Sequence, residues 1–124
     1  KTTDHGLGNN SVSGVYVSES NIYAATLGGL SISSDGGETW TNKTIVDGLG
    51  SNNIYGVYVS GANIYAATLG GLSISSDGGN SWNNETTSEG LASNHINGVH
   101  VSESSTYVAT ENGLSVSVPL VLVE

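Results

Sequence analysis

The sequence predicts an all-β protein of 124 residues that consists of three tandem copies of one small antiparallel sheet. The first observation is a period of 42 residues, seen in the segments "GLG", "GLG" and "GLA" that begin at Gly6, Gly48 and Gly90. The second is that β-branched and aromatic residues alternate with small polar ones between Gly and Asn, as in short strands. We place the units of this single repeat domain (1–124) at about 6–47, 48–89 and a degenerate 90–124.

Each unit is expected to contain four short antiparallel strands. In the first unit these are "GVYVS" from Gly14, "NIYAATL" from Asn21, "GLSIS" from Gly29 and "TWTNKT" from Thr39. The pair Gly28 and Gly29 is expected to form a two-residue hairpin turn, because Gly accepts positive φ. The adjacent Ala24 and Ala25 are poor strand formers, so their small size indicates crowding against a neighbouring sheet.

Composition excludes several classes of function. The chain has two Lys, no Arg, eleven carboxylates and a net charge of −9, so nucleic acid and anionic lipid would repel it. There is no Cys, which removes disulfides, thiolate nucleophiles and Cys-ligated zinc. No run approaches the roughly 20 apolar residues of a membrane-spanning helix, so membrane insertion is not expected. The Ser-, Thr- and Gly-rich composition is typical of exported β-proteins and indicates an extracellular or cell-surface location.

One peptide occurs twice between the third and fourth expected strands, as "SSDGGETW" and "SSDGGNSW". Its shared positions are Ser33, Asp35, Gly37, Thr39 and Trp40, and then Ser75, Asp77, Gly79, Ser81 and Trp82. This pattern resembles the Asp-box of BNR-repeat β-propellers, a family that includes bacterial sialidases and xyloglucanases. The resemblance implies a β-propeller with the peptide at the blade periphery, away from any catalytic face. We expect a buried Asp35 carboxylate that accepts turn amides, and a Trp40 that anchors the outgoing strand between sheets.

Three blades are too few to close a propeller, which usually has about four to eight. The exposed faces of the first and third blades would be apolar, so a homodimer that completes a six-bladed ring is expected. The third unit departs from the pattern, since residues 118–124 ("VPLVLVE") stand where the Asp peptide would begin. We expect this tail to seal the third blade or the junction between chains. A β-trefoil, which also contains three four-stranded repeats, is the alternative fold.

No catalytic, cofactor-binding or metal-binding residue is predicted. Asp35 and Asp77 are alternative calcium ligands, but each loop offers only one carboxylate. The three histidines, His5, His95 and His100, lie in different units without a common partner, which favours solvated or packing roles. Glu19 and Glu103 occupy equivalent positions on separate blades, so they do not form a catalytic pair. Trp40, Trp82 and four repeated tyrosines are alternative sugar-stacking platforms. For the tyrosines, packing between blades is favoured: Tyr16, Tyr23, Tyr58 and Tyr65.

The sequence therefore predicts a non-catalytic binding or scaffold module whose ring face recognises a glycan or a protein. Near-identical units would provide equivalent weak sites, which gain from multivalency. The alternative is a purely structural product of repeat amplification without a ligand. A fragment of a glycoside hydrolase is the third interpretation. The resemblance implies that a sialidase would hold its substrate carboxylate with an arginine cluster, and this chain contains no Arg, which argues against a sialidase.

Overall fold

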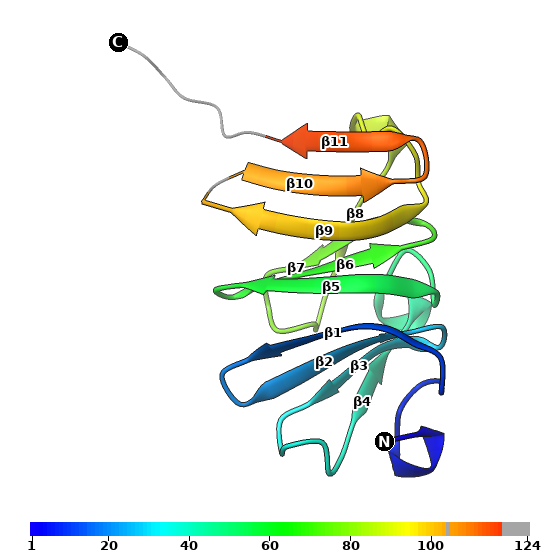
Figure 1. Ribbon diagram of the computed structural model, residues 1–124, viewed down its shortest axis with the longest axis vertical. Helices are drawn as coiled ribbons and strands as arrows, with labels where there is room; N and C mark the ends of the chain where they lie inside the picture. The colour runs from blue at the N-terminus through cyan, green and yellow to red at the C-terminus, as the bar shows by residue number, and fades with distance from the viewer. Residues whose placement is uncertain (104, 118–124) are drawn as a thin grey trace.

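The computed structural model describes residues 1–103 and 105–117, whose strands form three separate antiparallel sheets stacked along one axis (Figure 1). The strands of the first sheet are β1 (Val12–Ser18), β2 (Asn21–Thr26), β3 (Gly29–Ser33) and β4 (Thr41–Lys43). Those of the second are β5 (Ile54–Ser60), β6 (Asn63–Thr68), β7 (Gly71–Ser75) and β8 (Asn83–Glu85). The third contains β9 (Ile96–Ser102), β10 (Ser105–Thr110) and β11 (Gly113–Ser117). The predicted strand order is confirmed for both four-stranded units.

Each described sheet pairs only strands of its own unit, in sequence order from β1 to β4 and from β5 to β8. A β-trefoil closes a barrel by pairing strands of different units, so that alternative is wrong. The third sheet contains three strands within the described residues. The expectation that residues 118–124 replace the fourth strand lies outside these residues.

The sheets approach one another most closely along their first strands, β1, β5 and β9. A Cβ on Gly14 would lie 3.6 Å from the Gly56 Cα, and one on Gly56 would lie 3.6 Å from the Gly98 Cα. These three positions are equivalent in the repeat, so the same glycine allows both close approaches. The first strands therefore form the inner edge of the stack.

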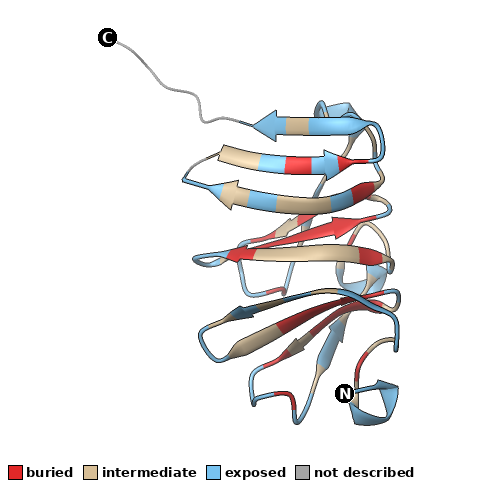
Figure 2. Cartoon of the chain, in the orientation of Figure 1, coloured by how far each residue is buried: buried red, intermediate tan, exposed pale blue. Residues whose placement is uncertain are grey.

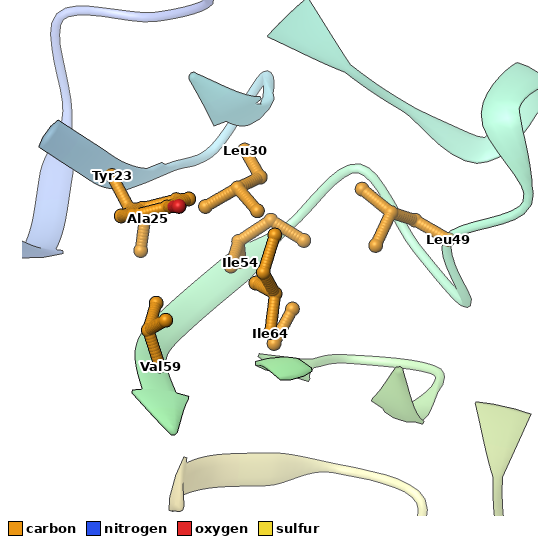
Figure 3. Packing of buried hydrophobic residues seen from close by; sticks show 8 residues of the cluster. Tyr23, Ala25, Leu30, Leu49, Ile54, Val59 and Ile64 are labelled. Atoms are coloured by element: carbon orange, nitrogen blue, oxygen red, sulfur yellow. The ribbon is translucent and has the colours of Figure 1, made fainter. Parts of the chain in front are cut away.

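Apolar side chains fill the spaces between sheets. At the first junction, Tyr23, Ala25 and Leu30 pack against Ile54 and Ile64 of the next sheet (Figure 3). The corresponding second cluster contains five buried residues, Tyr65, Ala67, Leu72, Ile96 and Val108. Burial is concentrated in the middle strands of the first two sheets, whereas the strands of the third are more exposed (Figure 2).

The predicted crowding of the paired alanines is confirmed, because Ala25, Ala66 and Ala67 are fully buried. The strand alternation places one alanine of each pair on each face of its sheet. In the middle sheet Ala66 faces the first junction and Ala67 the second, so a larger side chain at either position would push against a neighbouring sheet.

The prediction for the glycine hairpin is off by one residue. Thr26 pairs with Gly29, so Leu27 and Gly28 form the turn and Gly29 opens β3 with φ of 115°. Gly28 is required for a different reason, since a Cβ there would lie 2.3 Å from the Gly8 carbonyl oxygen. The backbone of the preceding loop occupies the space in which a side chain would stand.

Three single-turn 3₁₀ helices precede the sheets and were not predicted: η1 (Thr3–His5), η2 (Ile45–Asp47) and η3 (Thr87–Glu89). Each has a threonine N-cap whose hydroxyl accepts a backbone N–H, and each ends at a glycine with positive φ. In η2, the Thr44 N–H also donates to the Asp47 carboxylate at 2.9 Å. One turn is too short to produce a helical period, so only the cap residues signal it.

Candidate functional site

The two Asp-Gly-Gly loops, residues 33–40 and 75–82, share a set of hydrogen bonds around the serine and the aspartate. Ser33 Oγ donates to Asp35 Oδ1 at 2.8 Å and accepts the Gly37 N–H at 2.8 Å. The Thr39 N–H donates to the same carboxylate oxygen at 2.9 Å. The second loop repeats all three bonds at the same lengths with Ser75, Asp77, Gly79 and Ser81. The predicted role of the carboxylate as acceptor of a turn amide is confirmed.

The expectation of a buried carboxylate is wrong. Asp35 and Asp77 are exposed, and it is the serine two residues earlier in each loop that is buried. The Thr39 hydroxyl, the Thr39 N–H and the Ser33 hydroxyl hold the pKa of Asp35 at about 2. The Ser81 hydroxyl acts in the same way on Asp77, whose pKa is also about 2. Both carboxylates are therefore ionised at neutral pH and engaged by their own loops.

These loops have few ligands to offer a cation. Each supplies one carboxylate whose oxygens already accept loop donors, for example Oδ2 from the Thr39 hydroxyl. In residues 1–103 and 105–117, no group of three or more His, Asp or Glu side chains is arranged to hold a metal ion. A calcium site needs six to eight oxygen ligands, so the geometry gives the calcium alternative no support.

The tryptophans of the loops pack on the turns that precede each sheet. A Cβ on Gly6 would lie 3.5 Å from the Trp40 side chain, and one on Gly48 would lie 3.6 Å from Trp82. Trp82 also packs against the apolar cluster of the first junction. The predicted anchoring of the outgoing strand between sheets is therefore confirmed for Trp82.

The second junction contains a hollow of about 240 Å³, lined by residues that include Ile74, Glu85, Gly90 and Leu91. Gly90 is the counterpart of Gly48, yet nothing lies within 4 Å of a Cβ built on it. The repeat places the counterpart of Trp82 at position 124, which is Glu. Within the described residues, Gly90 therefore borders the hollow where Gly48 borders an indole.

The four tyrosines considered as sugar platforms lie between sheets, as predicted. Tyr23 and Tyr65 are buried in the two apolar clusters, and Tyr16 and Tyr58 pack against them. The ring centroids of Tyr16 and Tyr58 are 5.0 Å apart, and those of Tyr58 and His100 are 4.8 Å apart. These three equivalent residues form a continuous aromatic row across the inner strands, which leaves no open stacking face between them.

The histidines are not brought together. His5 accepts the Thr2 N–H through Nδ1 at 3.0 Å and so completes the cap of η1. His95 pairs with Glu111 at 2.8 Å and stacks on Tyr55 at 5.0 Å. These structural roles agree with the sequence-based interpretation, although the His95–Glu111 contact was not predicted.

Glu19 and Glu103 lie at the tips of the first hairpins of different sheets, with φ of 56° and 57°. Glu19 lines a second hollow of about 440 Å³ at the first junction. Ser18, Asn21 and Tyr23 line the same wall, and Val59 and Ile64 line the wall formed by the next sheet. The Asn21 amide donates to the Tyr23 hydroxyl at 3.2 Å, which fixes both groups beside the hollow.

The sequence analysis did not identify this hollow because its two walls come from units 42 residues apart. One signal was available: Asn and Tyr recur two residues apart at Asn63 and Tyr65, where the amide again donates to the hydroxyl, at 3.4 Å. A polar pair that recurs at a hairpin base indicates a maintained local geometry.

No protein-family model and no curated protein matches the chain. Solved structures do match. The chain is similar to the extracellular domain of the B. thetaiotaomicron protein BT4673, described as a one-component system, with a TM-score of 0.78 and 19% identity over 91% of this chain and 18% of that chain. It is similar to a GH74 enzyme of Niastella koreensis, with a TM-score of 0.64 and 24% identity over 90% of this chain and 20% of that chain. An ancestral GH74 enzyme gives a TM-score of 0.67 and 22% identity over 90% and 18%.

These similarities establish the fold, and the three sheets are blades of a β-propeller. The predicted fold class is confirmed. The chain spans about a fifth of the length of these proteins. Below, blade 1 denotes β1–β4, blade 2 denotes β5–β8 and blade 3 denotes β9–β11.

Proposed function

We propose that the chain is a non-catalytic binding module of the Asp-box propeller type that holds carbohydrate in the hollow between blades 1 and 2. The observation that carries this proposal is the hollow of about 440 Å³ with one polar and one apolar wall. A sugar presents hydroxyls at its edges and C–H groups on its faces, and such a site needs apolar surface with a few placed polar groups. Asn21, Glu19 and the Tyr23 hydroxyl supply those groups.

Absence of catalysis is part of the proposal. Glycoside hydrolysis generally needs two carboxyl groups that flank one bond, about 5–9.5 Å apart. Glu19 is the one carboxylate among the residues that line the hollow, and Glu103 is on another blade. The GH74 enzymes share the fold, but this chain covers only about a fifth of their length. Their hydrolytic activity is therefore not assigned to this chain.

We place the module outside the cell. Two of the similar structures are of the extracellular domain of one bacterial protein, BT4673 of B. thetaiotaomicron. The described part of the chain contains no helix with the length and hydropathy needed to cross a bilayer.

The test is a glycan array at neutral pH, followed by calorimetric titration of the sugars that bind. Asn21→Ala removes a hydrogen-bonding amide from the hollow, and Glu19→Gln replaces a charged acceptor with a neutral amide. Each is expected to weaken binding by about tenfold, since hydrogen bonds to charged groups are the stronger ones. Glu103→Gln is the matched control, since it has the same hairpin position on blade 3 and does not line the hollow. No release of reducing sugar from polysaccharides is expected.

The alternative is a scaffold without a ligand, and the near-identity of blades 1 and 2 favours it. Silence across the array would support this alternative and reject the carbohydrate site. Equal loss of binding in Glu103→Gln would move the site away from the hollow and also reject it. Binding of a protein in place of a sugar would retain the module class and replace its ligand.

A further inference from the structure

Two apolar faces are exposed at opposite ends of the blade stack. On blade 1, Val15 and Val17 project from β1 and are each 63% exposed. On blade 3, Leu114 and Val116 of β11 and Tyr107 of β10 are exposed. We refer to these as the blade 1 outer face and the blade 3 outer face.

The two outer faces repeat the surfaces that are packed together inside the molecule. Val59 is the counterpart of Val17 in the next unit, and it is 8% exposed. Leu30 and Leu72 are the counterparts of Leu114, and they are 0% and 3% exposed, against 66% for Leu114. The side chains are the same at the same sheet positions. Val59 is covered by the preceding blade, and Leu30 and Leu72 are covered by the next blade and flanked by the fourth strand of their own blade.

The backbone at the end of the stack is open in the same way. A Cβ on Gly14 or Gly56 would meet the next inner strand at 3.6 Å, whereas nothing lies within 4 Å of a Cβ on Gly98. The Gly29 position reports on a different neighbour, the fourth strand of its own blade, since a Cβ there would collide with the Lys43 carbonyl oxygen of β4. Within the described residues, blade 3 therefore has no next inner strand at Gly98 and no fourth strand at Gly113.

We propose that the blade 3 outer face binds the blade 1 outer face of a second copy of this chain, in the geometry that joins blades 1 and 2. The repeat then defines the contacts. Lys1 is the counterpart of Lys43, so the Lys1 carbonyl of the second copy covers Gly113. Tyr16 of the second copy extends the aromatic row beyond His100, as Tyr58 extends it beyond Tyr16.

The reciprocal contact uses the blade 1 outer face of the first copy, so two chains close a ring of six blades. Six lies within the usual range for propellers, and a head-to-tail interface that closes gives a finite assembly rather than a filament. This assembly goes beyond the proposed carbohydrate site and does not depend on it.

Charge does not oppose this docking strongly. The exposed side chains of the two outer faces are uncharged: Val15, Val17, Tyr107, Leu114 and Val116. Each chain has a net charge of −9, but exposed charges more than about 8 Å apart are largely screened at physiological ionic strength. Repulsion between distant charges of the two copies is therefore weak under these conditions.

The test is sedimentation equilibrium of the full chain. The expected mass is twice the chain mass of 12.6 kDa. Val17→Glu and Leu114→Glu each place a carboxylate in one outer face, and each is expected to raise the dissociation constant more than about tenfold because the charge would be buried without a partner. Val46→Glu is the matched control, since Val46 is 90% exposed on η2 and belongs to neither face.

The circular dichroism spectrum of each variant is expected to retain the β-structure of the parent. This result would show that the variant folds and would separate loss of docking from loss of folding. A mixture of Val17→Glu and Leu114→Glu has one unmodified pair of outer faces, so it is expected to recover dimer that neither variant forms alone. A mass of one chain for the parent would overturn the proposal and leave the faces to another occupant, such as residues 118–124 or further repeats of a longer chain. A filament, or a dimer unaffected by both face variants, would also overturn it.

Discussion

Leu30→Ala is expected to destabilise the protein by about 3–4 kcal/mol, because Leu30 is fully buried between blades 1 and 2. The substitution removes three carbon atoms, and about 0.8 kcal/mol per buried methylene gives about 2.4 kcal/mol for transfer. The cavity left behind increases this loss, and Leu→Ala changes in well-packed cores span about 2.7–5.0 kcal/mol. At about 2.1 cal/mol/K of unfolding entropy per residue, such a loss lowers the melting temperature by roughly 13 °C.

Urea unfolding followed by circular dichroism at one fixed protein concentration measures this change, since any assembly makes stability depend on concentration. Leu27→Ala is the control: Leu27 is three residues away at the tip of the β2–β3 hairpin and 38% exposed, so the same value per buried methylene gives a smaller loss, of about 1.5 kcal/mol or less. A loss below about 1 kcal/mol for Leu30→Ala would show that the two blades do not pack as described.

Two further predictions concern the loops. Gly28→Ala is expected to lower the urea midpoint of unfolding more than the single variant Gly36→Ala does. A Cβ on Gly28 would collide with the Gly8 carbonyl, whereas nothing in the described residues lies within 4 Å of a Cβ on Gly36. Equal effects would show that backbone strain at Gly36, whose φ is 75°, costs as much as the collision at Gly28. The pKa values of Asp35 and Asp77, lowered from 3.8 to about 2, make ionised carboxylates stabilising. This stabilisation is complete above about pH 4 and is lost as the pH falls through 2. The stability difference between the parent and Asp35→Asn with Asp77→Asn should shrink over that interval, and a difference independent of pH would contradict the assignment.

The sequence predicted the strands well because their signal is local. Alternating side chains within five to seven residues define β1, β3 and their counterparts, and the repeat supplies three readings of each element. The burial of Asp35 was predicted wrongly because a motif specifies which groups bond together, while exposure depends on what covers them. Ser33, whose hydroxyl bonds both the carboxylate and the Gly37 N–H, is buried together with Gly37, while Asp35 between them is exposed.

The hollow beside Asn21 could not be predicted, since it exists only when two units 42 residues apart are placed side by side. The hairpin error at Gly28 has a similar origin. Glycine at that position indicated a turn conformation, but the structure requires it for the approach of Gly8 from a preceding loop. Local patterns therefore predicted the elements of this protein, and contacts between elements determined the site.

The third unit differs from the other two in a way that bears on its outer face. Its substitutions include Thr106 and Val108, which replace the Ile64 and Ala66 of blade 2 on the face turned toward the preceding blade. The opposite face keeps Leu114 and Tyr107 unchanged from their counterparts, although both are exposed. An apolar outer face on a repeat promotes association with a further repeat, because each repeat buries its surface against its neighbours. Blade 3 has kept the residues with which blades 1 and 2 pack against their neighbours, so its outer face has the chemistry of an interface between blades.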